Sequence, residues 1–235
     1  MTKSFAALLA GVLTLGACAG DDADVTILAA SSLTEVLPEA TAVPGVSITT
    51  SYLGSASLAT QIEQGRPADL VITANRATMD RIVATGLVDG DPIELVQNRL
   101  VIAVPPDNPG GVDELSDLSV RALKIAACAP EVPCGALAAD LAADQGVELA
   151  IDSFDPSVRA VVTRVETGAV DAGLVYATDA AAADVTTIEI DDSGDFVTSY
   201  FVASLVEASP ESIDVLGQLL GEGRSVLAGA GFLTR

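Results

Sequence analysis

The 235-residue sequence contains no histidine and no tryptophan, and aromatic residues make up only 3% of it. Without histidine, neither a Ser-His-Asp triad nor a Cys-His nucleophile can be assembled. Neither of the two common glycine-rich phosphate loops is present. These absences argue against the major hydrolase and nucleotide-binding classes, and we expect that the protein is not an enzyme.

Basic residues are also scarce. The chain has 11 Lys and Arg against 33 Asp and Glu, for a formal net charge of −22. Such a chain has no basic surface for nucleic acid, and it does not attract anions at long range. Any anion site must therefore work through local dipoles. Acidic clusters such as Asp191, Asp192 and Asp195 lack the spacing of a specific Ca²⁺ loop, so we expect no directly bound metal.

The longest apolar run, residues 5–15, follows Lys3 at the N-terminus. It is too short to span a bilayer comfortably and has the form of a secretory signal. Its end, LGAC, resembles the lipobox of bacterial lipoproteins. We therefore expect a signal peptide over residues 1–17, a lipid on Cys18 and a short tether over 18–23, which together place the protein outside the cytoplasm on the cell membrane. The alternative is an ordinary signal peptide with an incidental cysteine.

Only two cysteines remain beyond Cys18. Cys128 and Cys134 lie six residues apart in the segment ACAPEVPCG. An even, closely spaced pair outside the cytoplasm indicates a disulfide. A zinc site is the alternative, but it has no histidine or further cysteine to complete it.

Short β-rich runs alternate with helical stretches along the chain. This alternation predicts an α/β protein in which helices cover mainly parallel sheets on both faces. The expected strands are 25–29, 46–52, 69–73, 99–104, 123–127, 172–175, 185–190 and 198–204. The expected helices are 33–42, 55–65, 75–86, 134–145, 157–168, 177–183 and 210–230.

Two breaks in the pattern suggest that the chain leaves one lobe and later returns to it. The first follows a strand at AVPPDNPGG, and the second lies in DDSGDFVT. We expect crossings near 103–105 and 196–199. Residues 24–102 and 200–235 would form one lobe, and residues 105–195 the other. Two α/β lobes joined in this way enclose a cleft, where ligands bind beyond the carboxyl ends of the strands.

Four strand-to-helix junctions carry hydroxyl or small residues. They are 31–32, 54–57, 133–135 and 155–158. A helix N-terminus presents unpaired N–H groups and about half a positive charge, so junctions that converge on a cleft make an uncharged anion site. Each junction taken alone is equally consistent with ordinary helix capping.

Several segments of the chain together resemble the substrate-binding proteins of molybdate ABC importers. The resemblance is collinear and covers essentially the whole chain after the signal peptide. The segments are ILAASSLTEVL (27–37), SYLGSASLATQIEQGRPADLVITAN (51–75), VPCGALAADL (132–141), SVRAVVTRVETGAVDAGLVYATDA (157–180) and GAGF (229–232).

The resemblance implies a type II periplasmic-binding fold whose two lobes close on molybdate or tungstate without counter-charges or a cofactor. It assigns hydroxyl donors to Ser32, Ser55 and Tyr176, and backbone N–H donors to Cys134 and Val158. The position of Cys134 is commonly alanine in the family. The implied partners are the oxyanion and the transmembrane subunits of an ABC permease, and the implied state is a monomer.

Two alternatives remain at this stage. A receptor for sulfate has the same requirements for donors, whereas a receptor for an organic acid usually needs an arginine in the cleft. Arg159 is the one candidate, and we interpret it as a rim residue or a support for the ligand loop. A catalytic or sensory protein that reuses the fold is the second alternative.

Overall fold

The computed structural model describes residues 24–191 and 193–234. The predicted signal peptide, Cys18 and the tether over 18–23 lie outside these residues. Within the described ranges, no helix combines the length and the hydrophobicity needed to cross a membrane.

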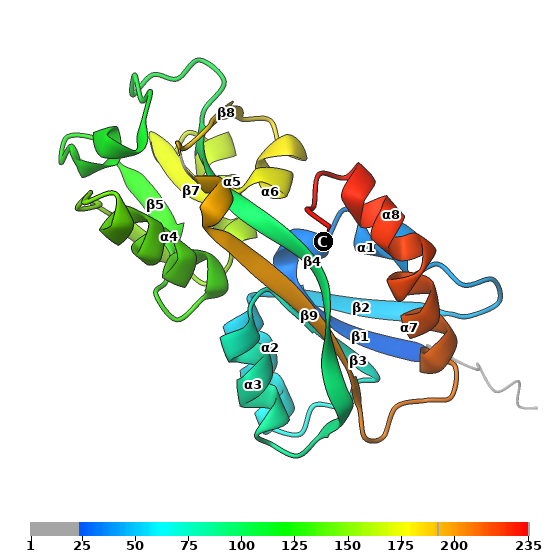
Figure 1. The fold of residues 1–235 in the computed structure, drawn as a ribbon. Helices are drawn as coiled ribbons and strands as arrows, with labels where there is room; N and C mark the ends of the chain where they lie inside the picture. The colour runs from blue at the N-terminus through cyan, green and yellow to red at the C-terminus, as the bar shows by residue number, and fades with distance from the viewer. Residues whose placement is uncertain (1–23, 192, 235) are drawn as a thin grey trace, which may run out of the picture.

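The described strands form one mixed sheet with two parallel groups in it (Figure 1). Strands β2, β1 and β3 are parallel neighbours, and so are β6, β5 and β7. Strands β4 and β9 lie between the two groups and pair antiparallel with each other. In sheet order the strands are β2 (Ile48–Leu53), β1 (Val25–Ala30), β3 (Leu70–Thr73), β9 (Val197–Leu205), β4 (Val88–Val104), β7 (Ala172–Tyr176), β5 (Ile125–Cys128) and β6 (Ser153–Asp155), with β8 (Thr186–Ile188) beside β4.

Helices cover both faces of each parallel group. The described α-helices are α1 (Leu37–Ala40), α2 (Ser55–Glu63), α3 (Arg76–Val83), α4 (Pro133–Asp144), α5 (Val158–Glu166), α6 (Ala177–Ala181), α7 (Ser212–Leu220) and α8 (Glu222–Gly229). Short 3-10 turns occur at Ser31–Leu33, Leu115–Ser119 and Ser193–Asp195. The fold is the α/β architecture that the alternation of strands and helices predicted, and it agrees with the type II periplasmic-binding fold that the family resemblance implied.

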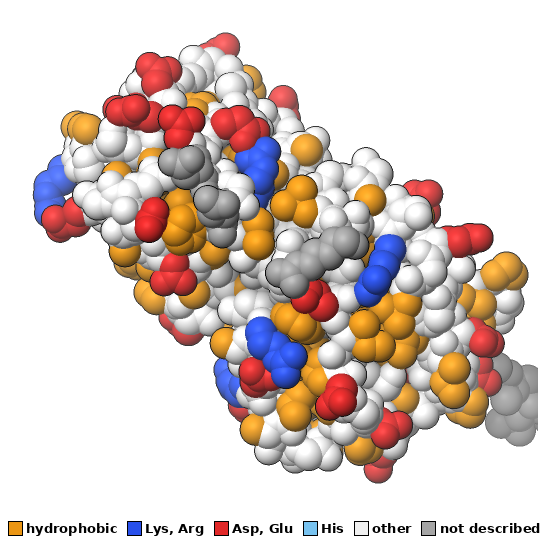
Figure 2. Space-filling model, in the orientation of Figure 1, with side chains coloured by type: hydrophobic (Ala, Val, Ile, Leu, Met, Phe, Trp, Pro, Cys, Tyr) orange, Lys and Arg blue, Asp and Glu red, His pale blue; other side chains and the backbone are white. Residues whose placement is uncertain are grey.

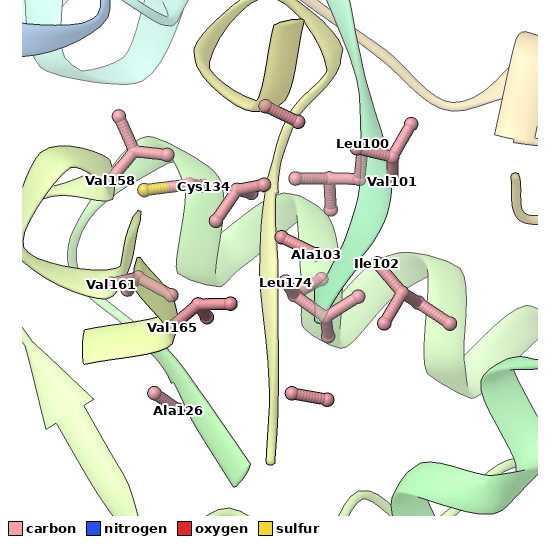
Figure 3. Packing of buried hydrophobic residues seen from close by; sticks show 14 of the residues in the cluster. Leu100, Val101, Ile102, Ala103, Ala126, Cys134, Val158, Val161, Val165 and Leu174 are labelled. Atoms are coloured by element: carbon pink, nitrogen blue, oxygen red, sulfur yellow. The ribbon is translucent and has the colours of Figure 1, made fainter. Parts of the chain in front are cut away.

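The buried side chains divide into the cores of two lobes. Lobe 1 has a core on each sheet face, because alternate residues of a strand point in opposite directions. Thus Ile27 packs with α1, α7 and α8, whereas its neighbour Leu28 packs with α2 and α3. Lobe 2 has one large core, built mostly from the aliphatic residues of β4, β5, β7, α4 and α5 (Figure 3). We use lobe 1 for the described residues 24–97 and 198–234, and lobe 2 for those between.

The strand β4 corrects the predicted position of the first crossing. Leu95 and Val96 belong to a core of lobe 1, whereas residues 100–104 belong to the core of lobe 2. The chain therefore crosses near residues 97–99, and not at 103–105. The first half of β4 was not predicted as strand. It contains Gly90 with a φ of 75° at an irregularity in the pairing with β9, and its proline and acidic residues hide the strand pattern.

Two predicted helices were wrong in extent. The helix expected over 33–42 is only α1, because a proline inside a helix removes a hydrogen bond and clashes with the preceding turn, so the helix begins one residue before Pro38. The helix expected over 210–230 is broken at Gly221, whose ψ of −107° is not helical. The break allows α8 to pack against α1, where a Cβ on Gly223 would lie 2.4 Å from the Ala40 carbonyl oxygen. Strand β6 was not predicted.

Candidate functional site

A small cavity of about 10 Å³ lies between the two lobes, where the carboxyl ends of β1 and β7 meet. The residues that line it come from five chain segments of the two lobes and from the end of β7. All five residues that the sequence singled out for an anion are among them. The lining residues are Ala30, Ser31, Ser32, Gly54, Ser55, Ala74, Val132, Pro133, Cys134, Ser157, Val158 and Tyr176.

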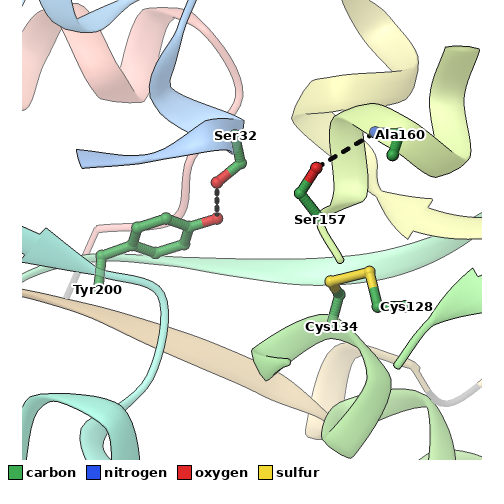
Figure 4. The surroundings of a disulfide bond; sticks show 6 residues. All are labelled: Ser32, Cys128, Cys134, Ser157, Ala160 and Tyr200. Atoms are coloured by element: carbon green, nitrogen blue, oxygen red, sulfur yellow. Dashed lines mark hydrogen bonds between the residues drawn. A yellow bond between two sulfur atoms is a disulfide. The ribbon is translucent and has the colours of Figure 1, made fainter. Parts of the chain in front are cut away.

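Ser32 reaches the cavity from a 3-10 turn, and not from the start of an α-helix as expected. Its hydroxyl lies 2.6 Å from the hydroxyl of Tyr200, a fully buried residue of β9 (Figure 4). Each hydroxyl has one proton, so the direction of this bond decides whether Ser32 can donate a hydrogen bond to a ligand or only accept one. If Tyr200 donates, the Ser32 proton is left for a ligand. The sequence analysis did not select Tyr200, because it is a single aromatic residue in an apolar strand.

Ser55 is the first residue of α2, after an extended Gly54. The Ser55 hydroxyl accepts a hydrogen bond of 3.0 Å from the backbone N–H of Ala74, which follows β3. With this acceptor position filled, the hydroxyl can donate its own proton into the cavity. The side chain is 2% exposed, so that proton has little access to bulk water.

Cys134 and Val158 stand in the first turns of α4 and α5. Their side chains belong to the core of lobe 2 (Figure 3), so only their backbones can serve a ligand. The first N–H groups of a helix have no acceptor within the helix. Pro133 occupies the first position of α4, where its missing N–H costs nothing, and the N–H of Cys134 is the first one available. Ser157 caps α5 by accepting from Ala160 N–H at 3.3 Å.

Tyr176 ends β7 and is 1% exposed. Its hydroxyl has no hydrogen-bond partner among the described residues. Burial, with smaller contributions from Tyr200 and Asp179, raises the pKa of Tyr176 well above its ordinary value. Burial likewise raises the pKa of Tyr200. Both phenols therefore keep their protons at neutral pH and remain hydrogen-bond donors.

No lysine or arginine is among the described residues that line the cavity. The nearby Arg159 guanidinium pairs with Glu35 of lobe 1 at 3.0 Å, at the rim of an adjoining cavity. Arg159 therefore lies outside the donor cavity, and its role as a rim residue or a support for the ligand loop stays a prediction. Acidic side chains are more frequent than basic ones over the surface seen in Figure 2. Among the described residues no three acidic or cysteine side chains are grouped to hold a metal ion, and both Asp192 and the side chain of Asp195 lie outside what the structure describes.

A disulfide joins Cys128, at the end of β5, to Cys134 in the first turn of α4 (Figure 4). The bond closes the short loop that precedes α4. The next residue, Gly135, also fits this loop closely, since a Cβ there would lie 2.1 Å from the Ala129 carbonyl oxygen. The bridge and the close packing together fix the position of the Cys134 N–H.

The lobes touch directly beside the cavity. A Cβ on Gly54 of lobe 1 would lie 2.1 Å from the carbonyl oxygen of Pro156 in lobe 2. Such a distance leaves no room for any side chain, so glycine permits the approach. The Arg159–Glu35 pair makes a second contact between the lobes. The structure is therefore closed around the cavity.

The fold and the site define a class: a two-lobed binding protein whose enclosed site carries neutral hydrogen-bond donors. The comparison with known families agrees with this class. The model of the bacterial extracellular solute-binding protein family matches residues 25–233, and the chain belongs to this family.

Individual relatives agree with this assignment. The chain is 34% identical to the molybdate-binding protein ModA of Mycobacterium tuberculosis (strain ATCC 25618 / H37Rv) over 194 residues, covering 80% of this chain and 74% of the relative. The periplasmic molybdate-binding protein of Azotobacter vinelandii shares the fold, with a TM-score of 0.73, 16% identity and coverage of 90% and 99%. The sulfate-binding protein SubI of M. tuberculosis H37Rv also shares it, with a TM-score of 0.71, 19% identity and coverage of 88% and 85%.

Proposed function

We propose that this protein captures molybdate or tungstate by hydrogen bonds from neutral donors and delivers the anion to an ABC permease without altering it chemically. The observation that carries the proposal is the convergence of Ser32, Ser55, Cys134, Val158 and Tyr176 on one enclosed cavity without a cation. The molybdate-binding relative with 34% identity supports the choice of ligand.

The donors suit a fully deprotonated tetrahedral dianion. Ser55 already accepts a hydrogen bond from Ala74, and Ser32 can accept one from Tyr200, so both hydroxyls are left as donors toward a ligand. Hydrogen phosphate carries a proton that needs an acceptor, and leaving that proton unpaired costs about 1–3 kcal/mol. Sulfate is also a bare dianion and is discriminated only by its shorter bonds, which lengthen several hydrogen bonds at once.

The site argues against an organic acid. A carboxylate ligand usually has an arginine partner. Arg159 is engaged by Glu35 and is absent from the lining of the donor cavity. Sulfate is the remaining alternative, because a sulfate-binding protein has the same fold.

The remaining steps of the proposed cycle rest on the sequence and the family. The protein acts as a monomer outside the cytoplasm, held to the membrane by a lipid on Cys18. The lobes open and close about β4 and β9, which make both crossings between them. The closed form then docks on the permease.

Calorimetry on the purified protein tests the choice of ligand. Molybdate and tungstate should bind most tightly, sulfate more weakly, and phosphate most weakly at pH 7.5, where phosphate is largely the hydrogen phosphate dianion. Tight binding of sulfate together with no heat from molybdate would reject the proposal in favour of a sulfate receptor.

A further inference from the structure

A second cavity adjoins the donor cavity and shares Ser31 and Ser32 with it. Lobe 1 lines this second cavity with residues such as Glu35 and Phe232, and lobe 2 lines it with Arg159 and Asp179. It is therefore a space that exists only while the lobes are together. Asp179 lies on helix α6, three residues after the candidate ligand Tyr176.

Asp179 is an unusual residue in the lining of this cavity, because it is a buried acidic side chain. Its side chain is 2% exposed, and neither carboxylate oxygen has a hydrogen-bond partner among the described residues. A buried carboxylate without a partner is stable only when it is protonated or when its desolvation is offset elsewhere. The donor cavity nearby is proposed to receive two more negative charges.

The groups around Asp179 do not neutralise it. Helix α6 packs against β4, β7, β8 and α5. The guanidinium of Arg159 favours the charged carboxylate, but it is itself paired with Glu35, whose charge has the opposite effect on Asp179. Tyr176 at the end of β7 and Tyr200 of β9 also interact with Asp179, and both are neutral phenols. On the strands packed against α6, Arg99 of β4 is paired with Glu189, which follows β8.

We propose that Asp179 takes up a proton from solvent when the lobes close on the oxyanion, so that anion capture and proton uptake are coupled. The inference rests on the proposed function, since it requires a dianion in the donor cavity. With its proton, Asp179 adds no negative charge beside the bound dianion. The residue acts on affinity through charge and is not itself a ligand.

The pKa of Asp179 supports this coupling. Burial is the largest cause, and it raises the pKa to about 7 in the closed structure, where Arg159 lowers it and Glu35 raises it further. A dianion nearby raises the pKa again. Separation of the lobes removes the residues of lobe 1 from the shared cavity and returns the carboxylate to water, where an aspartate has a pKa near 3.9.

The sign of the pH dependence follows from these two states. The closed complex holds the proton more tightly than the open form, so binding takes up a proton between the two pKa values. Affinity then falls as pH rises through this window, by up to about tenfold per pH unit when one proton is coupled. Above the pKa of the complex, affinity levels off at its lower value.

Calorimetry with molybdate in buffers of different ionisation enthalpy measures the number of protons taken up. At pH 6.5 we expect close to one proton per anion for the wild-type protein. Asp179→Asn keeps the shape of the side chain without its titration, so it should take up almost none, and its affinity should stay level between pH 6 and 8. Asp184→Asn, an exposed residue shortly after α6, is the control for charge and should behave as wild type.

The outcomes separate the two proposals. Molybdate binding by the wild-type protein with no proton uptake overturns the coupling and leaves the proposed function standing. Equal uptake by the wild type and Asp179→Asn overturns the assignment to Asp179. No binding of molybdate by any of the three proteins at any pH rejects the proposed function, and the coupling with it. If Asp179→Asn fails to fold, the number of protons that the wild-type protein takes up on binding molybdate still decides whether capture and proton uptake are coupled.

Discussion

In the proposed site, the two lobes provide hydrogen-bond donors to one cavity by different chemical means. Lobe 1 contributes side-chain hydroxyls, Ser32 and Ser55, each of which contacts another polar group of the same lobe. Lobe 2 contributes backbone N–H groups at two helix starts, with the side chains of Cys134 and Val158 turned into its core. Tyr176 is the hydroxyl of lobe 2 that is proposed to donate, whereas the Ser157 hydroxyl, which also belongs to a lining residue, accepts from Ala160 N–H.

This difference indicates at which positions the identity of the side chain matters for binding. A hydroxyl donor requires a residue that has a hydroxyl group. Whether that hydroxyl donates to the ligand also depends on a neighbour such as Tyr200. A backbone donor depends only on where a helix starts, so its side chain is free to do other work. Cys134 illustrates this freedom, because its side chain forms a disulfide while the residue lines the cavity. We therefore expect substitutions in lobe 1 to affect affinity and those in lobe 2 to affect stability.

Keeping the lobes apart should have the largest effect, since it separates the two sets of donors. Gly54→Ala introduces a Cβ 2.1 Å from the Pro156 carbonyl oxygen, while the backbone of Gly54 (φ −61°, ψ 139°) accepts alanine readily. Losing two or more hydrogen bonds to a charged ligand, at about 1.5–3 kcal/mol each, lowers molybdate affinity more than roughly a hundredfold. Calorimetry measures the loss.

Gly217→Ala is the matched control. Gly217 lies in α7 of lobe 1, and a Cβ there meets nothing within 4 Å. This variant should bind as wild type. A Gly54→Ala protein with normal affinity but a lowered melting temperature would show that the Gly54–Pro156 contact serves the fold and not closure.

Removing one hydroxyl of lobe 1 should have an intermediate effect. Ser55→Ala deletes a single hydrogen bond to a charged ligand, which is worth about 1.5–3 kcal/mol, or roughly ten- to 150-fold in affinity. Ser57→Ala makes the same chemical change one half-turn along α2, outside the cavity lining, and should leave affinity unchanged. Equal affinities of the two variants would mean that Ser55 only supports the backbone at Ala74.

Shortening a side chain of lobe 2 should have the smallest effect on affinity. Val158→Ala keeps the backbone N–H, so affinity should change less than about threefold, which is below 1 kcal/mol. The same change removes buried methyl groups from the core and should lower the free energy of unfolding by roughly 2 kcal/mol. Chemical denaturation and calorimetry on one preparation give both numbers. A large loss of affinity in a stable protein would contradict the backbone role.

The helix starts in the site were predictable because their signals are local. Gly54-Ser55, Pro133 and Ser157 are residues that favour the first positions of a helix, and the helices begin there within one residue of expectation. Alternating strands and helices likewise predicted the fold class. The family resemblance selected five residues that the structure places around one cavity.

The features that were missed depend on contacts between distant residues. Tyr200 meets Ser32 across 168 positions, and no spacing in the sequence indicates that pairing. Asp179 lines a cavity between the two lobes, while its sequence context is an ordinary short helix. The first half of β4 gains its strand conformation from pairing with β9, which outweighs the local preferences of its glycine and proline.

Crystallography of the protein with molybdate tests the central claim most directly, because anomalous scattering locates the molybdenum atom. We expect one molybdenum position between the lobes. The oxygens should lie about 2.7–3.1 Å from the hydroxyls of Ser32, Ser55 and Tyr176 and from the backbone nitrogens of Cys134 and Val158. Molybdenum held by the Arg159 guanidinium, or bound outside this cavity, would contradict this expectation.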